Sequence, residues 1–193
     1  MKHALGPQNS VHPTPIPLVM SGVGDEASML AVAWVMPAGS KPPALALVIG
    51  RRHHTWDLIE RSGGEFTVNF APSHLFREVD YCGVVSGREH DKIAGSGLTL
   101  VESQVVAPPM IAECPYNHEC RLLAEYDLPT SSHLVVAEVV QSHANEDVLN
   151  AEGTRPDVAR MDPLVYATGN REYFRLGERL ETAYSCGKAL LKE

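Results

Sequence analysis

Residues 49–70 read IGRRHHTWDLIERSGGEFTVNF, and this stretch decides the fold. A strand ends at Ile49 and a basic loop follows it. A short helix then begins with Thr55 as its N-cap, because threonine is a residue type that caps helices. Gly63-Gly64 ends this helix. Apolar side chains alternate over residues 66–70, which predicts a second strand directly after the helix.

The start of this helix is a favourable place for an anion. The first amides of a helix lack intrahelical acceptors and carry partial positive charge. Four basic or titratable residues stand beside them, namely Arg51, Arg52, His53 and His54. The Thr55 hydroxyl either caps the helix or bonds a phosphate. The local pattern also leaves open a solvated basic loop before an ordinary amphipathic helix.

Length and composition indicate one globular domain. The chain has 193 residues, of which 44% are hydrophobic, enough for one well-filled core. We therefore expect a single domain over residues 1–193, with residues 1–16 and 176–193 as extensions that serve dimer contacts. The net charge of −8 would repel a polyanion, so a nucleic-acid partner is not expected.

The sequence predicts a cytoplasmic protein with reduced thiols. No apolar run approaches the roughly 20 residues that span a bilayer, so no membrane association is expected. Residues 1–17 contain prolines and a glycine where a signal peptide needs a continuous apolar stretch. The four cysteines are too scattered for a secreted disulfide framework.

The rest of the chain consists mainly of short apolar runs bounded by turn residues. We expect a hairpin turn at residues 24–26, a short helix over 73–81, and polar loops over 83–92 and 145–162. We expect strands over residues 18–23, 29–36, 44–49, 98–102, 110–113, 118–126, 133–141, 163–166 and 173–174. Residues 133–141 read as a strand buried on both faces. Many short strands with few helices favour a mainly β fold, a barrel or a sandwich.

Two motif matches are weighed and disfavoured. Residues 22–27 fit the relaxed dinucleotide pattern G-x-G-x-x-A, but that pattern needs a helix next, and residues 29–36 read as a strand. Cys114, His118 and Cys120 follow the period of a strand and would share one face. Because no second cysteine pair completes a ligand set, we predict buried thiols and no metal site.

His133 is a candidate ligand-facing residue. It begins the clearest strand, at the mouth of the expected barrel, which is where a barrel presents groups to a ligand. The alternative interpretation is an edge histidine whose nitrogens are satisfied within the fold. No G-x-S-x-G elbow supports serine hydrolysis.

Several segments taken in order carry a resemblance that no single motif provides. They are Pro13–Pro17 (PTPIP), 31–34 (AVAW), 41–43 (KPP), 55–59 (TWDLI), 64–70 (GEFTVNF), 86–93 (SGREHDKI), 97–99 (GLT), 113–120, 132–134 (SHL) with 138–139, and 163–166 (PLVY) with 173–177 (YFRLG). In this combination the chain resembles the flavin reductase-like family of FMN-binding split barrels, and within it the flavoredoxin type. The resemblance extends over nearly the whole chain.

The resemblance implies a Greek-key split β-barrel that binds FMN without a covalent bond, usually as a homodimer. It places Arg51, His53, Thr55 and Lys92 at the FMN phosphate. The strand that runs beside the isoalloxazine contributes Ser28, Met29, Leu30, Ala31 and Trp34. It also places His133, as a candidate catalytic residue, and Tyr166 near the ring. It leaves open whether these two residues come from the same subunit or from the other one.

The chain departs from the family pattern at three of these positions. Ser28 stands where the family commonly has asparagine, and Ala31 stands where it has a hydroxyl residue. His53 replaces an arginine that is often found in the phosphate loop, and Arg51 and Arg52 are the residues available to compensate. We therefore expect weaker FMN binding, or binding that depends on pH through His53.

The resemblance implies an FMN-dependent oxidoreductase or electron-transfer protein. The flavin would take a hydride from NAD(P)H, or electrons from a redox protein, and pass them to a small acceptor or a partner. One alternative is a flavin reductase that supplies reduced flavin to a partner monooxygenase. A second alternative is a non-catalytic flavin-binding module, which the changes at Ser28 and Ala31 keep open.

Overall fold

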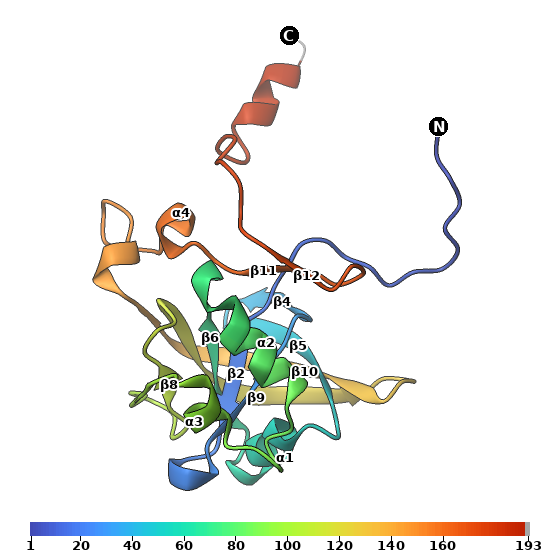
Figure 1. Cartoon of the computed structure of the whole chain (residues 1–193). Coiled ribbons are helices and arrows are strands. Elements are labelled where there is room, and N and C mark those ends of the chain that lie inside the picture. Colours follow the sequence, from blue (N-terminus) through green and yellow to red (C-terminus); the bar gives the residue numbers. More distant parts are fainter. Residues whose placement is uncertain (192–193) are drawn as a thin grey trace.

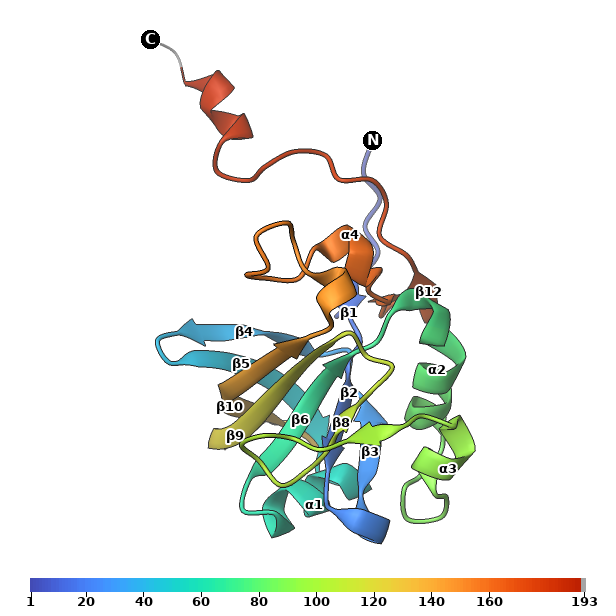
Figure 2. The same ribbon diagram turned by 90° about the vertical axis from the view of Figure 1, so that its left-hand side faces the viewer.

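The computed structural model describes residues 1–191 (Figure 1). Within this range one antiparallel sheet contains most of the strands. Its spatial order is β3 (Ser28–Ala31), β2 (Leu18–Ser21), β6 (Glu65–Phe70), β9 (Tyr116–Asp127), β10 (Ser132–Ala144), β5 (Pro43–Gly50) and β4 (Val35–Ser40). The sheet curves around its interior in the manner of a split barrel (Figure 2). The mainly β, split-barrel prediction is therefore confirmed.

Two smaller sheets complete the β structure of the described residues. One has the order β1 (Thr14–Pro15), β11 (Val165–Ala167) and β12 (Glu172–Phe174). The other pairs β7 (Leu100–Val101) with β8 (Met110–Ile111). The first of these lies at the opposite end of the molecule from α1 (Figures 1 and 2).

The described residues also form short α-helices. They are α1 (His54–Arg61), α2 (Phe76–Val84), α3 (Lys92–Ser96) and α4 (Val158–Met161). Helix α1 packs against β2, β3 and β6, while α2 and α3 both pack against β3. No helix in residues 1–191 combines the length and the apolar composition that crossing a bilayer requires.

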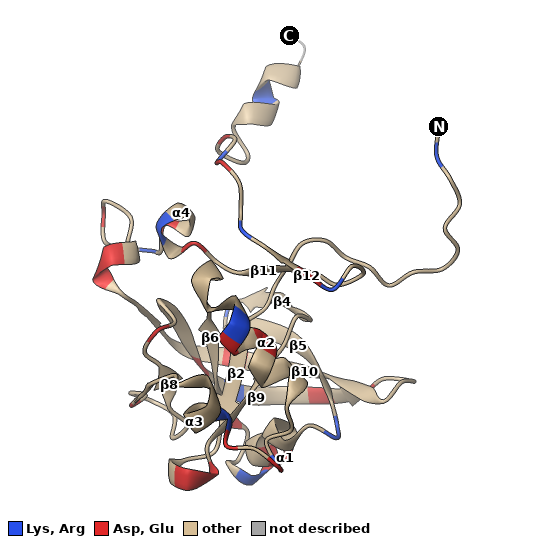
Figure 3. Cartoon of the chain, viewed as in Figure 1, with Lys and Arg blue, Asp and Glu red and all other residues tan. Residues whose placement is uncertain are grey.

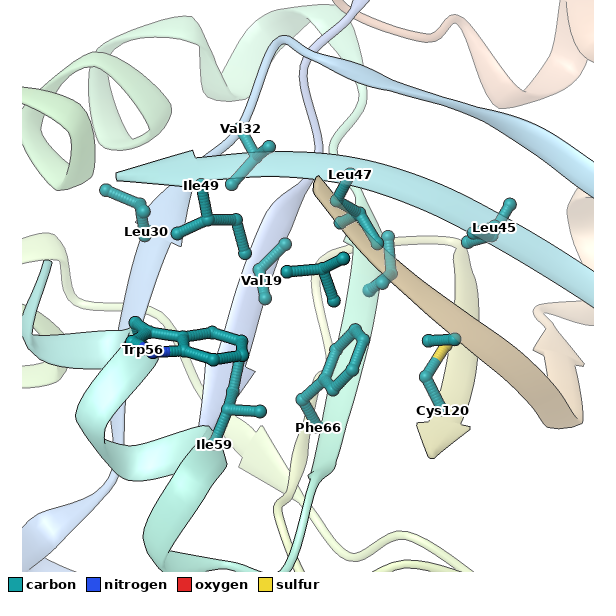
Figure 4. Packing of buried hydrophobic residues seen from close by; sticks show 13 residues of the cluster. Val19, Leu30, Val32, Leu45, Leu47, Ile49, Trp56, Ile59, Phe66 and Cys120 are labelled. Atoms are coloured by element: carbon teal, nitrogen blue, oxygen red, sulfur yellow. The ribbon is translucent and has the colours of Figure 1, made fainter. Parts of the chain in front are cut away.

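The period of two along each strand divides the core into two clusters. The inner cluster lies inside the curved sheet and includes Val19, Leu30, Trp56, Phe66 and Cys120, among others (Figure 4). The outer cluster lies between the sheet and the α2–α3 side. It contains Leu18, Met20, Met29, Val79, Cys82 and Cys114, with further residues from the neighbouring elements.

The order strand, basic loop, helix, strand over residues 49–70 is confirmed, with one correction. The N-cap of α1 is His53, and Thr55 lies buried in the first turn. Gly63 and Gly64 both adopt positive φ and end α1, as predicted.

Three other sequence expectations are corrected. Residues 29–36 form two strands, because β3 ends at Ala31 and β4 occupies the far edge of the same sheet. Strand β10 alternates between buried and half-buried positions over its first residues and is not buried on both faces. Cys114 and Cys120 share no face, since Cys114 precedes β9 and packs in the outer cluster.

Candidate cofactor site

The first turn of α1 presents backbone donors to a small cavity. The amides of His53 and Trp56 bond the carbonyls of Gly50 and His53, at 3.0 Å each. The amides of His54 and Thr55 have no acceptor in the described part of the chain. Two unpaired N–H groups at a helix start, reinforced by the helix dipole, form an anion site.

Three segments far apart in the sequence enclose this α1 cavity, which has a volume of about 180 Å³. They are β3, the loop with the first turn of α1, and the segment from the end of α2 to the start of α3. The lining residues are Leu30, Arg52, His53, His54, Thr55, Val84, Val85, Ser86, Gly87 and Lys92. The cavity is large enough for a phosphate group, and it carries several basic groups.

Two buried polar atoms close to the cavity have no partner in residues 1–191. They are the Ser28 hydroxyl oxygen and the His54 Nδ1 atom. Gly87 passes close to both side chains, because a Cβ at this position would lie 2.5 Å from Ser28 Oγ and 3.0 Å from His54 Cδ2. Buried polar groups are normally satisfied, so these two indicate a site built for a polar ligand.

Lys92 connects the walls of the cavity. Its Nζ donates to the carbonyl oxygen of Met29 in β3 at 2.9 Å and to that of Cys82 in α2 at 2.7 Å. An ammonium group has three donors, so one N–H remains for a ligand. Burial lowers the pKa of Lys92, and burial together with the Lys92 charge lowers the pKa of His53.

The two neighbouring arginines have different surroundings. Arg51 donates from Nε to Asp127 Oδ1 at 2.8 Å and lies 4.0 Å from Glu125, so it is held at the end of β9. It does not line the α1 cavity, whereas Arg52 does. Of the two arginines, the structure therefore brings Arg52 to the α1 cavity and does not bring Arg51 there. In the sequence, the basic run over residues 51–54 was the signal that pointed to both Arg52 and His54 as site residues.

The predicted residues of β3 divide between its two faces. Leu30 lines the α1 cavity, and Ser28 lines an adjoining cavity of about 410 Å³. Met29 and Ala31 pack toward α2 in the outer cluster. Trp34 follows β3 and is 47% exposed, so its ring is free to contact a ligand or another chain.

The adjoining cavity shares His54, Gly87 and Lys92 with the α1 cavity and carries both charge signs. Arg61 pairs with Glu26 at 2.7 Å, and Arg88 pairs with Asp57. Figure 3 shows these acidic and basic segments side by side around α1. The sequence analysis gave Ser86 and Gly87 no role in the site, although both belong to the segment 86–93 that contributes to the resemblance.

His133 and Tyr166 do not join the cavity in this chain. His133 is fully buried behind α1 and meets Trp56 edge to face, with ring centroids 4.0 Å apart. Because this side chain is fully buried, it does not lie at an open mouth as expected, and neither of its ring nitrogens has a partner in the described residues. Tyr166 packs on Tyr173 at 5.3 Å in the small sheet opposite α1.

Comparison with known proteins agrees with this geometry. A model of the flavin reductase like domain matches residues 9–176. The flavoredoxin of Desulfovibrio vulgaris (Miyazaki F) is 32% identical, with a TM-score of 0.90 over 97% of this chain and 100% of that chain. The flavoredoxin of Methanosarcina acetivorans is 31% identical, with a TM-score of 0.86 over 99% and 98%.

A curated relative is also similar to about two thirds of this chain. An uncharacterized protein of Archaeoglobus fulgidus is 36% identical over 124 residues, which are 64% of this chain and 68% of the relative. The family match covers most of the chain, and both structural matches cover nearly all of it. The chain therefore belongs to the flavin reductase-like family, whose members bind flavin.

Proposed function

We propose that the chain binds FMN non-covalently and acts as a cytoplasmic oxidoreductase or electron-transfer protein of the flavoredoxin type. The observation that carries the proposal is the α1 cavity, where two unpaired amides, Arg52 and the third N–H of Lys92 face one small space. This donor set suits the several acceptor oxygens of a phosphate monoester.

The protein's own groups would bind and position the cofactor. Arg52, Thr55 and Lys92 would hold the phosphate, and the Ser28 hydroxyl would gain the partner that it lacks. Bound FMN would supply hydride and single-electron transfer. The half-exposed Trp34 offers an apolar wall for a flat ring, and Tyr166 would lie near the ring in an assembled homodimer.

The first test is the visible spectrum of the purified protein, before and after addition of FMN. We expect flavin absorbance that bleaches when NADH or NADPH is added without oxygen, or when a reduced redox protein is added. A protein that is colourless when purified and fails to bind added FMN would contradict the proposal and support a barrel that has lost its cofactor. Fast exchange of FMN during turnover would favour the reductase that supplies a partner monooxygenase.

The second test uses the two arginines as a matched pair. Arg52→Ala removes a charge from the cavity, whereas Arg51→Ala removes one that is held by Asp127. A hydrogen bond to a charged group contributes about 1.5–3 kcal/mol, so Arg52→Ala should weaken FMN binding about 10- to 100-fold. Arg51→Ala should change it little. Equal losses in a fluorescence titration would contradict the assigned phosphate site.

A further inference from the structure

His54 is a titratable residue of the site with a buried nitrogen that lacks a partner. It is the first residue of α1, and it lines both the α1 cavity and the adjoining cavity. Its Nδ1 atom is buried and has no hydrogen-bond partner in residues 1–191. Each imidazole nitrogen donates or accepts a hydrogen bond, and buried polar atoms are normally satisfied. A ligand in these cavities would supply the partner that the described residues do not.

Ser28 places a second unpartnered atom beside this ring. It is only 5% exposed, and its hydroxyl oxygen has no partner in the described residues. A Cβ at Gly87 would lie 2.5 Å from Ser28 Oγ and 3.0 Å from His54 Cδ2, so both side chains border the same point of the backbone. Turning the imidazole by 180° exchanges Nδ1 with Cδ2, which brings the nitrogen to the Gly87 side without any backbone movement. The two side chains can therefore bind one polar group from the adjoining cavity, which both of them line.

The surroundings of His54 keep its ring neutral in the cofactor-free chain. Burial lowers the pKa of His54, and the positive charges around the ring lower it further. The charged groups that act on the ring are Arg88, Arg61 and Lys92, which lower the pKa, and Asp57, which raises it. The other charged or titratable residues that line the two cavities are Asp25, Glu26, Arg52, His53, Glu89, His90 and Asp91. Because the cations outweigh the carboxylate that acts on it, the ring gains a proton near neutral pH only when a negative ligand arrives.

We propose that His54 takes up one proton from solvent when a phosphate group binds in the α1 cavity, and that the resulting imidazolium donates to a phosphate oxygen. The inference rests on the proposed function, because FMN is the source of that phosphate. A phosphate monoester carries about 1.5–2 negative charges at pH 7, which favours the charged form of the ring. Because binding then consumes a proton, FMN should be held more tightly as the pH falls. Cofactor occupancy would depend on pH through His54.

His53 is the neighbouring histidine from which this role must be distinguished. It lines the α1 cavity but not the adjoining one. Its ring lies against the backbone of Gly50, since a Cβ there would be 3.0 Å from His53 Cδ2 and 3.2 Å from His53 Nε2. Asparagine has a side-chain amide that donates hydrogen bonds but does not titrate. The variants His54→Asn and His53→Asn therefore form a matched pair.

The test is the dissociation constant of FMN between about pH 6.5 and 8.5, measured by fluorescence titration. The second pKa of a phosphate monoester is about 6, so the phosphate is mainly a dianion across this range. Uptake of one proton raises the dissociation constant by up to about tenfold per pH unit. We expect a rise of at least about threefold over the range for the unmodified chain and for His53→Asn. The His54→Asn variant should show almost no rise.

Calorimetry of FMN binding gives a second readout that needs no variant. With the unmodified chain, the binding enthalpy should differ between buffers of different ionisation enthalpy, in the direction that corresponds to proton uptake. The same enthalpy in every buffer, or equal pH dependence in His54→Asn and the unmodified chain, would overturn the inference and leave the proposed function intact. A chain that binds no FMN at any pH would contradict the proposed function and this inference with it.

Discussion

Replacing Lys92 by methionine tests whether this residue holds the cavity together. The substitution keeps the length and the apolar stem of the side chain but removes its three donors. Lys92 is 4% exposed, and its Nζ bonds the carbonyl oxygens of Met29 and Cys82. The variant therefore leaves two buried acceptors without a donor.

The expected loss of stability follows from these two contacts. An unsatisfied buried polar group costs about 1–3 kcal/mol, which gives about 2–6 kcal/mol for both carbonyls. Part of this is offset because the variant no longer buries a charge, and the lowered pKa of Lys92 shows that burial of the charge is unfavourable. We expect a net decrease of about 1–4 kcal/mol in the free energy of unfolding.

Urea unfolding of the cofactor-free protein measures this change, with Lys41→Met as the matched control. Lys41 is exposed, so the same substitution there should alter stability by less than about 0.5 kcal/mol. FMN titration of the Lys92 variant should also show weaker binding. If the two variants unfold at the same urea concentration with the same slope, Lys92 does not tie β3 to α2 and the reasoning fails.

Three further predictions concern other buried groups. Glu119 accepts hydrogen bonds from the backbone amides of residues 104–106. Glu119→Gln should speed hydrogen exchange at these amides and lower the free energy of unfolding by about 1–3 kcal/mol. Unchanged exchange would refute the assigned contacts. Burial lowers the pKa of His118 to about 4, so the unfolded state binds more protons between about pH 4 and 6.5. The free energy of unfolding should therefore be highest above pH 6.5 and fall by roughly 3 kcal/mol toward pH 4. In urea unfolding, the His118→Gln variant should lose less stability between pH 6.5 and pH 4 than the unmodified chain. An equal loss in the two proteins would show that other groups cause it. Gly87→Ala places a methyl group 2.5 Å from Ser28 Oγ and should destabilise the chain by about 1–3 kcal/mol. Adding Ser28→Ala should restore part of that loss in thermal unfolding, and a double variant that is no better than Gly87→Ala would contradict the close approach of Gly87 to Ser28.

The elements that the sequence predicted correctly are those whose signals are local. The glycine pair after α1 and the alternation over residues 66–70 each act within a few residues of the structure that they define. The division of residues 29–36 is not local. The apolar run continues past Ala31, but β3 and β4 pair with different strands at opposite edges of the sheet. A run of apolar residues contains no information about which strand each part will pair with.

Side-chain direction in the basic loop has the same long-range origin. Arg51 and Arg52 are identical in type and adjacent in sequence, so no local rule separates them. Arg51 turns toward Asp127 because β5 and β10 are paired, as are β10 and β9, which brings the acidic end of β9 close to Gly50. His133 is buried for a related reason, since helix α1 places Trp56 over it.

The role of Lys92 shows how such long-range contacts change the interpretation of a site. From the sequence, Lys92 was a source of positive charge for a phosphate. In the structure its ammonium already joins β3 to α2, and only its remaining donor faces the cavity. The cavity walls come from three segments that are distant in sequence. The anion site can therefore exist only when the sheet, α1 and α2 are assembled. Cofactor binding should therefore stabilise the whole fold by mass action rather than order one loop.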